Sequence, residues 1–283
     1  MPSFPRTEVA GVSLPRMLMG SNWMLGYSHT TVSADEMIRK RYSQVQNVCD
    51  MVSAYLEYDI DAMMAPFGGQ PVLLDGIKMA EDTAGKKIIK IDTPIINVND
   101  SAAARAEARA KIEESAKNGA KFCLIHHSSA EQLVNKNKGT IERLPDYLDM
   151  IRQAGMIPGL SAHMPELILY SDDNEYDVQT YIQIYNCVGF LMQVEIEGVR
   201  AIIENAKKPV MSIKSMAAGR VSPYVGITFS YATLRPCDMV TVGAFTPEEV
   251  HEDVEIGLAA IERRFPNLER RSSPNKTAVL GGK

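Results

Sequence analysis

Long hydrophobic runs, paired cysteines and an excess of basic residues are all missing from this sequence. No apolar stretch approaches the roughly 18 residues of a membrane helix, and no charged-then-apolar leader opens the chain, so we expect neither a membrane span nor a secretory signal. The formal net charge of -5 argues against a nucleic-acid partner, which would require a basic face.

The cysteines give no sign of a disulfide framework or a thiolate metal site. The four of them are widely spaced, without a CxxC pair, and Cys123 lies within an apolar segment. Reduced core thiols in the cytoplasm are therefore expected. The expected partner is a small-molecule substrate, and the sequence leaves the oligomeric state open, a homo-oligomer included.

The segment KFCLIHH, residues 121–127, is apolar on both faces and ends in two histidines. A strand that is buried on both faces is typical of a parallel sheet covered by helices. In such folds the polar groups at the carboxyl end of the strand carry the chemistry. With alternating side chains, His126 should point inward with Phe122 and Leu124, and His127 should point toward the helices in a structural role.

Segments of this kind recur along the chain, each followed by a helical segment. The eight expected strands are residues 16–20, 59–65, 86–92, 121–127, 156–163, 176–186, 209–214 and 238–243. Eight such units predict an α/β fold, a (β/α)8 TIM barrel over residues 1–269, with a short N-terminal segment before it and a disordered tail over 270–283. The rival, a doubly wound open sheet, needs a Gly-rich turn that MGSNWMLG matches poorly.

Capping residues mark several helix starts. Ser33 is expected to cap a helix that begins at Ala34, with Glu36 completing a capping box. Thr246 is followed by Pro247 and two glutamates, which predicts the start of the last helix.

Asp92, His126 and His163 end three consecutive expected strands. Neighbouring strands lie about 4.8 Å apart, so three inward side chains could meet at one divalent metal, zinc or a similar ion. His29 and His127 are further possible ligands, or could hydrogen-bond to the ligands. The alternative is a set of hydrogen-bonding groups without metal, because the spacing is not a compact ligand motif.

Other polar residues follow the strands and could complete a pocket. Lys214 ends the seventh strand and could anchor a phosphate or carboxylate, act as a base or form a Schiff base, and pairing with an acid is the structural alternative. Aromatic and polar side chains suited to substrate contact, or in the case of Trp23 to core packing, are Asn22, Trp23, Tyr27, His29 and Tyr185.

From the fourth strand onward the chain resembles the aldo-keto reductase superfamily. The segments are LIHHSS, IRQAGMIPGLSAHMPELI, VQTYIQIYN, SMAAGRVSP and CDMVTVGAFTPEEVHED, in the order of that family, and VSLPRMLMGSNWMLG resembles its opening hairpin and first strand. The resemblance implies a (β/α)8 barrel and NAD(P)H-dependent carbonyl reduction.

The resemblance breaks at the catalytic tetrad. The aspartate of the family falls on Ala62, its tyrosine on Phe67 and its lysine on Asp92, and only its histidine is kept, as His126. Phe67 would then border the substrate without a hydroxyl to donate a proton.

The cofactor positions are retained in part. Ser161 and Gln183 match residues that hold the nicotinamide amide, and residues 211–219, ending at Gly219, resemble the loop that crosses the dinucleotide. The last motif lacks the arginine that many members use for a 2′-phosphate, although Thr246 and the helix start could hold an anion. NADP is therefore less favoured than in the family at large, and NAD or no dinucleotide stays open.

Three functions follow. The first is a divergent enzyme that acts on a small sugar-like or keto-acid substrate as a metal-assisted lyase, isomerase or hydrolase through Asp92, His126, His163 and Lys214. The second is an NAD(P)H-dependent reductase in which Tyr27 or Tyr185 replaces the missing tyrosine. The third is a barrel that only binds.

Overall fold

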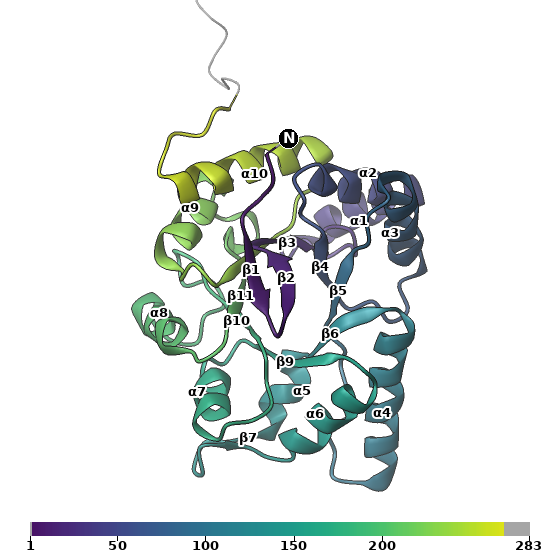
Figure 1. Cartoon of the computed structure of the whole chain (residues 1–283), viewed down its shortest axis with the longest axis vertical. Helices are drawn as coiled ribbons and strands as arrows, with labels where there is room; N and C mark the ends of the chain where they lie inside the picture. Colours follow the sequence, from purple (N-terminus) through teal and green to yellow (C-terminus); the bar gives the residue numbers. More distant parts are fainter. Residues whose placement is uncertain (1, 269–283) are drawn as a thin grey trace, which may run out of the picture.

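A computed structural model describes residues 2–268 as a closed barrel of eight parallel strands with helices around the outside (Figure 1). The barrel strands are β3 (Met17–Gly20), β4 (Ala62–Ala65), β5 (Ile89–Asp92), β6 (Ala120–Ile125), β9 (Ile157–Ala162), β10 (Tyr181–Ile184), β11 (Val210–Ile213) and β12 (Met239–Val242). Each strand pairs with the next in the sequence, and β12 closes the ring on β3. The expected (β/α)8 barrel is confirmed, and each of its strands lies within an expected segment except β6, which begins one residue before residues 121–127.

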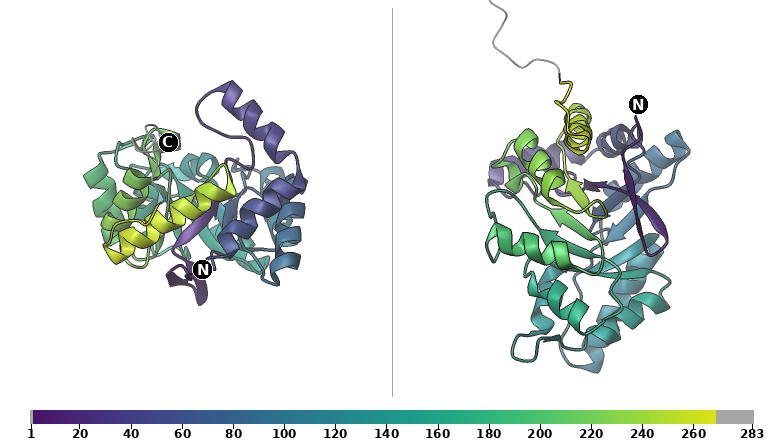
Figure 2. Two further views of the ribbon diagram at one scale, coloured as in Figure 1. Left: turned by 90° about the horizontal axis from the view of Figure 1, so that it is seen from above. Right: turned by 60° about the vertical axis from the view of Figure 1, so that its left-hand side comes forward.

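The helices cover the barrel from all sides, as two further views show (Figure 2). They are α1 (Val32–Tyr42), α2 (Val45–Leu56), α3 (Pro71–Ala84), α4 (Ala102–Lys117), α5 (His127–Ala130), α6 (Leu144–Gln153), α7 (Glu166–Asp173), α8 (Ile196–Asn205), α9 (Pro223–Thr233) and α10 (Pro247–Glu262), with 3-10 turns η1 (Glu131–Leu133) and η2 (Ala217–Gly219). No helix within residues 2–268 is long and apolar enough to cross a membrane.

Two antiparallel hairpins lie outside the barrel sheet. The first joins β1 (Arg6–Val9) to β2 (Val12–Pro15), and the second joins β7 (Val134–Asn135) to β8 (Thr140–Ile141). Val9 and Leu14 of the first hairpin are buried in the same apolar cluster as the barrel interior. This hairpin therefore closes the amino-terminal end of the barrel and leaves the carboxyl end as the open one.

Side-chain alternation divides the strands into an inner and an outer face. On β6, Phe122 and Leu124 belong to the barrel interior, whereas Cys123 and Ile125 pack in the larger cluster between the strands and the helices. All four are fully buried, which explains why this strand is a continuous apolar run. Burying a side chain of this size contributes about 1.5–3 kcal/mol, so the interior stabilises the barrel on which the site is built.

The start of the first helix differs from the prediction. Thr31, not Ser33, is the N-cap of α1, since its side chain accepts a hydrogen bond from Ala34 N at 3.2 Å. The apolar positions from Met37 to Leu56 predict one helix, but the chain is broken at Ser43 into α1 and α2. The predicted cap at Thr246 is confirmed, since its hydroxyl accepts from Glu249 N at 3.2 Å. The predicted disordered tail lies outside the described residues.

Candidate active site

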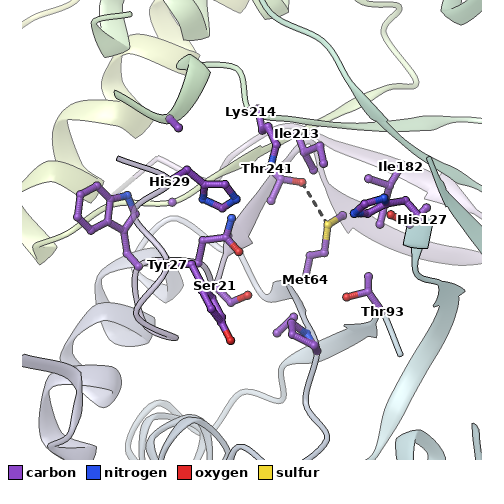
Figure 3. Close-up of a pocket in the computed structure, with 18 of the residues that line it drawn as sticks. Ser21, Tyr27, His29, Met64, Thr93, His127, Ile182, Ile213, Lys214 and Thr241 are labelled. Carbon is purple, nitrogen blue, oxygen red and sulfur yellow. Dashed lines mark hydrogen bonds between the residues drawn. The ribbon is translucent and has the colours of Figure 1, made fainter. Parts of the chain in front are cut away.

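A cavity of about 410 Å³ lies at the carboxyl ends of the barrel strands (Figure 3). This is the end of the barrel where side chains from several strands can face one small molecule. The polar and aromatic residues that line it are Ser21, Asn22, Trp23, Tyr27, Ser28, His29, Thr93, His126, His127, Ser161, His163, Lys214, Ser215 and Thr241. The floor includes Met64 on β4, whose sulfur accepts a hydrogen bond from Thr241 Oγ1 at 3.9 Å.

Four of the five histidines of the chain line this cavity, and three of them form a cluster. The rings of His127 and His163 are stacked, with centroids 3.6 Å apart and planes 16° from parallel. The centroid of His126 lies 4.2 Å from that of His127. The two histidines that end KFCLIHH therefore share the cavity, and the prediction that His127 faces the helices is wrong. The strand ends at Ile125, so strand alternation no longer applies at His127, which is the first residue of α5.

The hydrogen bonds of His126 determine which ring nitrogen carries its proton. Nδ1 accepts from the backbone N of Ser128 at 3.3 Å and lies 2.8 Å from the hydroxyl of Ser128. A nitrogen that accepts a backbone N–H has no proton of its own, so the proton of the neutral ring is on Nε2. Nε2–H is thus the donor that His126 can offer to a molecule in the cavity.

The clustered histidines are neutral at ordinary pH. Burial, with smaller contributions from His127 and Lys214, lowers the pKa of His126 to about 4 and that of His163 to about 3. The pKa of His29 and that of His127 are also lowered, mainly by burial. These rings offer hydrogen bonds and flat surfaces to a ligand, and no positive charge.

Lys214 supplies the charge of the cavity. It directly follows β11, has a left-handed backbone with φ of 61°, and is the one lysine or arginine among the described residues that line the cavity. Burial lowers the pKa of its ammonium group, with no carboxylate near enough to oppose the effect. The prediction that Lys214 faces the site is consistent with this position, and its chemical role stays a prediction.

The predicted meeting of Asp92, His126 and His163 at one metal is wrong. Asp92 is on the outer face of β5, where its Oδ1 accepts from Phe67 N at 3.2 Å and its carboxylate is bonded to Ser115 of α4. Within residues 2–268 no group of three or more His, Cys, Asp or Glu side chains could hold a metal ion. The strand places Thr93, one residue later, at the cavity instead. Asp92 therefore joins β5 to its neighbours, and burial raises its pKa.

Two of the expected substrate-contacting residues do not line the cavity. Phe67 is fully buried in the outer cluster. Tyr185 is also buried, with its hydroxyl 3.1 Å from Thr233 Oγ1 and its ring beside Phe229 of α9. The other expected contacts, Asn22, Trp23, Tyr27 and His29, do line it. Of the two tyrosines considered as a replacement proton donor, only Tyr27 borders the cavity.

The residues expected to hold a dinucleotide are also divided. Ser161 and Gly219 line the cavity, and so does Ser215, whose buried hydroxyl has no hydrogen-bond partner among the described residues. Gln183 lies outside the lining and donates from Nε2 to His163 O at 3.3 Å, although its buried Oε1 lacks a partner. The lining serines, with the unused hydroxyl of Ser215, suit the amide of a nicotinamide, whereas Gln183 lies outside the lining.

The start of α10 fits a 2′-phosphate poorly. Thr246 lies outside the cavity lining, and its hydroxyl is already used to cap the helix. Glu249 accepts from Phe245 N at 2.7 Å, and Glu248 adds a second carboxyl group to the same turn. A helix start with satisfied N–H groups and two acidic side chains repels a phosphate. The residues therefore fit NAD better than NADP.

Several cavity residues were not predicted from the sequence. Thr93 and Thr241 follow Ile91 and Met239, which belong to the barrel interior, at an interval of two residues. Extending the inward alternation past the last apolar residue of each strand would have found both. Ser215 lies in the turn after β11 and His127 begins α5, so strand alternation gives no signal for either.

No protein-family model matches the sequence, and no curated protein matches it significantly. Solved structures do match the fold. A provisionally assigned aldo-keto reductase from Pseudomonas aeruginosa has a TM-score of 0.65 at 13% identity, covering 92% of this chain and 98% of that one. The chain has the fold of the aldo-keto reductases. An aldo/keto reductase from Klebsiella pneumoniae, in complex with NADP and acetate, has a TM-score of 0.58 at 13% identity over 96% and 98% of the two chains. Aldose reductase from Giardia lamblia has a TM-score of 0.52 at 10% identity over 90% and 89%.

Proposed function

We propose that this protein is a nicotinamide-dependent oxidoreductase that reduces a small carbonyl compound, with NAD as its dinucleotide. The observation that carries the proposal is His126, whose Nε2–H is the free donor of a neutral ring at the cavity. The aldo-keto reductase fold and the NADP bound by the structure from Klebsiella pneumoniae support it.

Ser161, Ser215 and Gly219 are the residues that would hold the nicotinamide end of the dinucleotide. A bound nicotinamide supplies the hydride that turns a carbonyl carbon into an alcohol carbon. The chain itself has to bind the carbonyl oxygen and provide a proton for it. Phe67 lies outside the cavity and Tyr27 is the one tyrosine among the described residues at its border, and the proposed mechanism assigns these tasks to the nitrogen donors, His126 and Lys214.

His126 and Lys214 divide these tasks in the proposed mechanism. Nε2–H of His126 donates a hydrogen bond to the carbonyl oxygen and orients it, as a neutral imidazole can do without losing its proton. Nζ of Lys214 stabilises the negative charge that develops on the oxygen and then gives it a proton. Burial lowers the pKa of Lys214, which makes its ammonium group a better acid near neutral pH.

Dinucleotide binding and carbonyl reduction test the proposal together. Trp23 is the single tryptophan and lines the cavity, so quenching of its fluorescence should follow NADH binding. Oxidation of NADH by small aldehydes and ketones should be seen in the unaltered protein, and His126→Ala should lower kcat about 100-fold or more. Absence of both quenching and NADH oxidation would exclude the proposal.

Proton abstraction next to a carbonyl, without dinucleotide or metal, is the second candidate. The unpaired Lys214 favours it, because a lysine with a lowered pKa can also accept a proton. It predicts exchange of the hydrogens next to the carbonyl for deuterium in heavy water, in the absence of NADH. A protein that oxidises NADH but catalyses no such exchange excludes this candidate.

A further inference from the structure

Lys214 is a half-buried cation without a counter-ion among the described residues. It has neither a hydrogen-bond nor a carboxylate partner among the described residues, and burial is the one influence on its pKa. None of the described residues that line the cavity is acidic. Removing an ammonium group from water without a compensating partner is costly, so an unpaired one in a cavity calls for a negative group from outside the chain.

The surroundings of Lys214 strengthen this requirement. All four cavity histidines have lowered pKa values and are neutral, so they neither compete for an anion nor offset the lysine charge. Ser215, the next residue, also lines the cavity, and its buried hydroxyl has no partner among residues 2–268. An ammonium group and an unused hydroxyl on adjacent residues together form a place for a carboxylate.

We infer that the substrate carries a carboxylate next to its reacting carbonyl, as in a 2-oxo acid, and that Lys214 pairs with that carboxylate. The inference rests on the proposed function for the reacting carbonyl. In a 2-oxo acid one carboxylate oxygen and the carbonyl oxygen can lie on the same side of the molecule. A single ammonium group, which has three donors, can then contact both. Lys214 thereby selects substrates with a carboxylate and also contacts the carbonyl oxygen that is reduced.

Binding of matched probes without dinucleotide tests the inference. The probes are 2-oxobutanoate and its neutral amide, 2-oxobutanamide. Their binding is measured by the change in fluorescence of Trp23, which lines the cavity. The acid should bind the unaltered protein about 10- to 100-fold more tightly than the amide. Lys214→Met should reduce that preference to about twofold or less, and Lys214→Arg should retain part of it. Equal binding of acid and amide to the unaltered protein would overturn the inference.

The matched control is Lys121→Met, an exposed lysine near the amino end of β6, which should leave the preference unchanged. Circular dichroism and thermal melting establish that each variant is folded. If Lys214→Met does not fold, the binding preference of Lys214→Arg provides the test instead. Inorganic pyrophosphate and ADP distinguish the phosphates of a dinucleotide as the source of negative charge. Lys214-dependent binding of these two, with none for 2-oxobutanoate, would assign the lysine to the dinucleotide and overturn the inference.

Turnover separates this inference from the proposed function. If 2-oxobutanoate binds through Lys214 but NADH is not oxidised, carbonyl reduction is wrong and the carboxylate preference stands. If NADH reduces neutral ketones with the same kcat/KM as 2-oxo acids, reduction stands and the carboxylate preference is wrong.

Discussion

His163 should lower the free energy of unfolding in acid, because its place in the cavity lowers its pKa. Burial and the neighbouring positive charges lower its pKa from 6.5 to about 3 in the folded protein. The unfolded chain takes up a proton as the pH falls through 6.5, whereas the folded protein does not. Folding stability contributed through this group therefore falls as the pH decreases below 6.5 and stops changing below about 3.

The size of the effect at pH 5 follows from the same two values. This pH is 1.5 units below the ordinary pKa of 6.5 and above the folded value of about 3. At about 1.36 kcal/mol per unit, the loss is at most ~2 kcal/mol. The side chain of His163 is partly exposed, and screening by solvent reduces the expected loss to about 1 kcal/mol.

The assay compares the unaltered protein with His163→Gln by urea unfolding at pH 7.5, 6.5 and 5. The difference in unfolding free energy isolates His163, because the other titrating groups are present in both proteins. It should shift by about 1 kcal/mol in favour of the variant between pH 7.5 and pH 5. Ser161→Ala, which changes the same cavity without a titrating group, should show a constant difference. If the difference in unfolding free energy between His163→Gln and the unaltered protein stays constant or shifts the other way, His163 is not held neutral in the folded protein.

Three further predictions concern the packing around the site. Burial raises the pKa of Asp253 to about 8, so the cost of keeping it in the folded protein grows from pH 5 to pH 8. Asp253→Asn should therefore stabilise the protein more at pH 8 than at pH 5, by up to about 4 kcal/mol in urea unfolding. An equal gain at both pH values would contradict this. Gly226→Ala places a Cβ 2.5 Å from Ser215 O, which should lower the free energy of unfolding by about 1–3 kcal/mol and weaken ligand binding. An unchanged Tm would contradict the close approach of Gly226 to Ser215. Phe67→Tyr should lower stability by about 1–3 kcal/mol, because its hydroxyl would be buried without a partner, and should not raise carbonyl reduction; a gain in turnover would show that the ring reaches the substrate.

The barrel could be predicted from the sequence because its signals are local and repeated. Each strand is a short apolar run with a turn residue nearby. Strands that are apolar on both faces indicate a parallel sheet covered by helices. The inward alternation of Phe122, Leu124 and His126 followed from period two alone, and the first two of these lie in the barrel interior. Fold class therefore depended on patterns that tolerate errors of one or two residues.

The cavity is less tolerant of such errors. A shift of one residue moves a side chain from the inside of the barrel to the outside, and Asp92 was assigned to the inner face when Thr93 holds that position. His127 was assigned by strand alternation although the chain had already turned into α5. Tyr185 was chosen for its residue type and Phe67 through the resemblance, but both side chains pack between the strands and the helices. Site residues thus depend on where each strand ends, which sequence patterns give least accurately.

The charge of the cavity lies on one side of the barrel only. Where the resemblance to aldo-keto reductases calls for an acid and a lysine on the second and third strands, Met64 and Thr93 face the cavity, and neither can ionise. Lys214 lies at the opposite end of the cavity from Thr93 (Figure 3). A ligand therefore meets an ammonium group at one end, the hydroxyl of Thr93 at the other, and the flexible thioether of Met64 between them. This polarity favours a small molecule with a negative head and a short apolar tail, oriented so that its carbonyl lies beside the neutral imidazoles between the two ends.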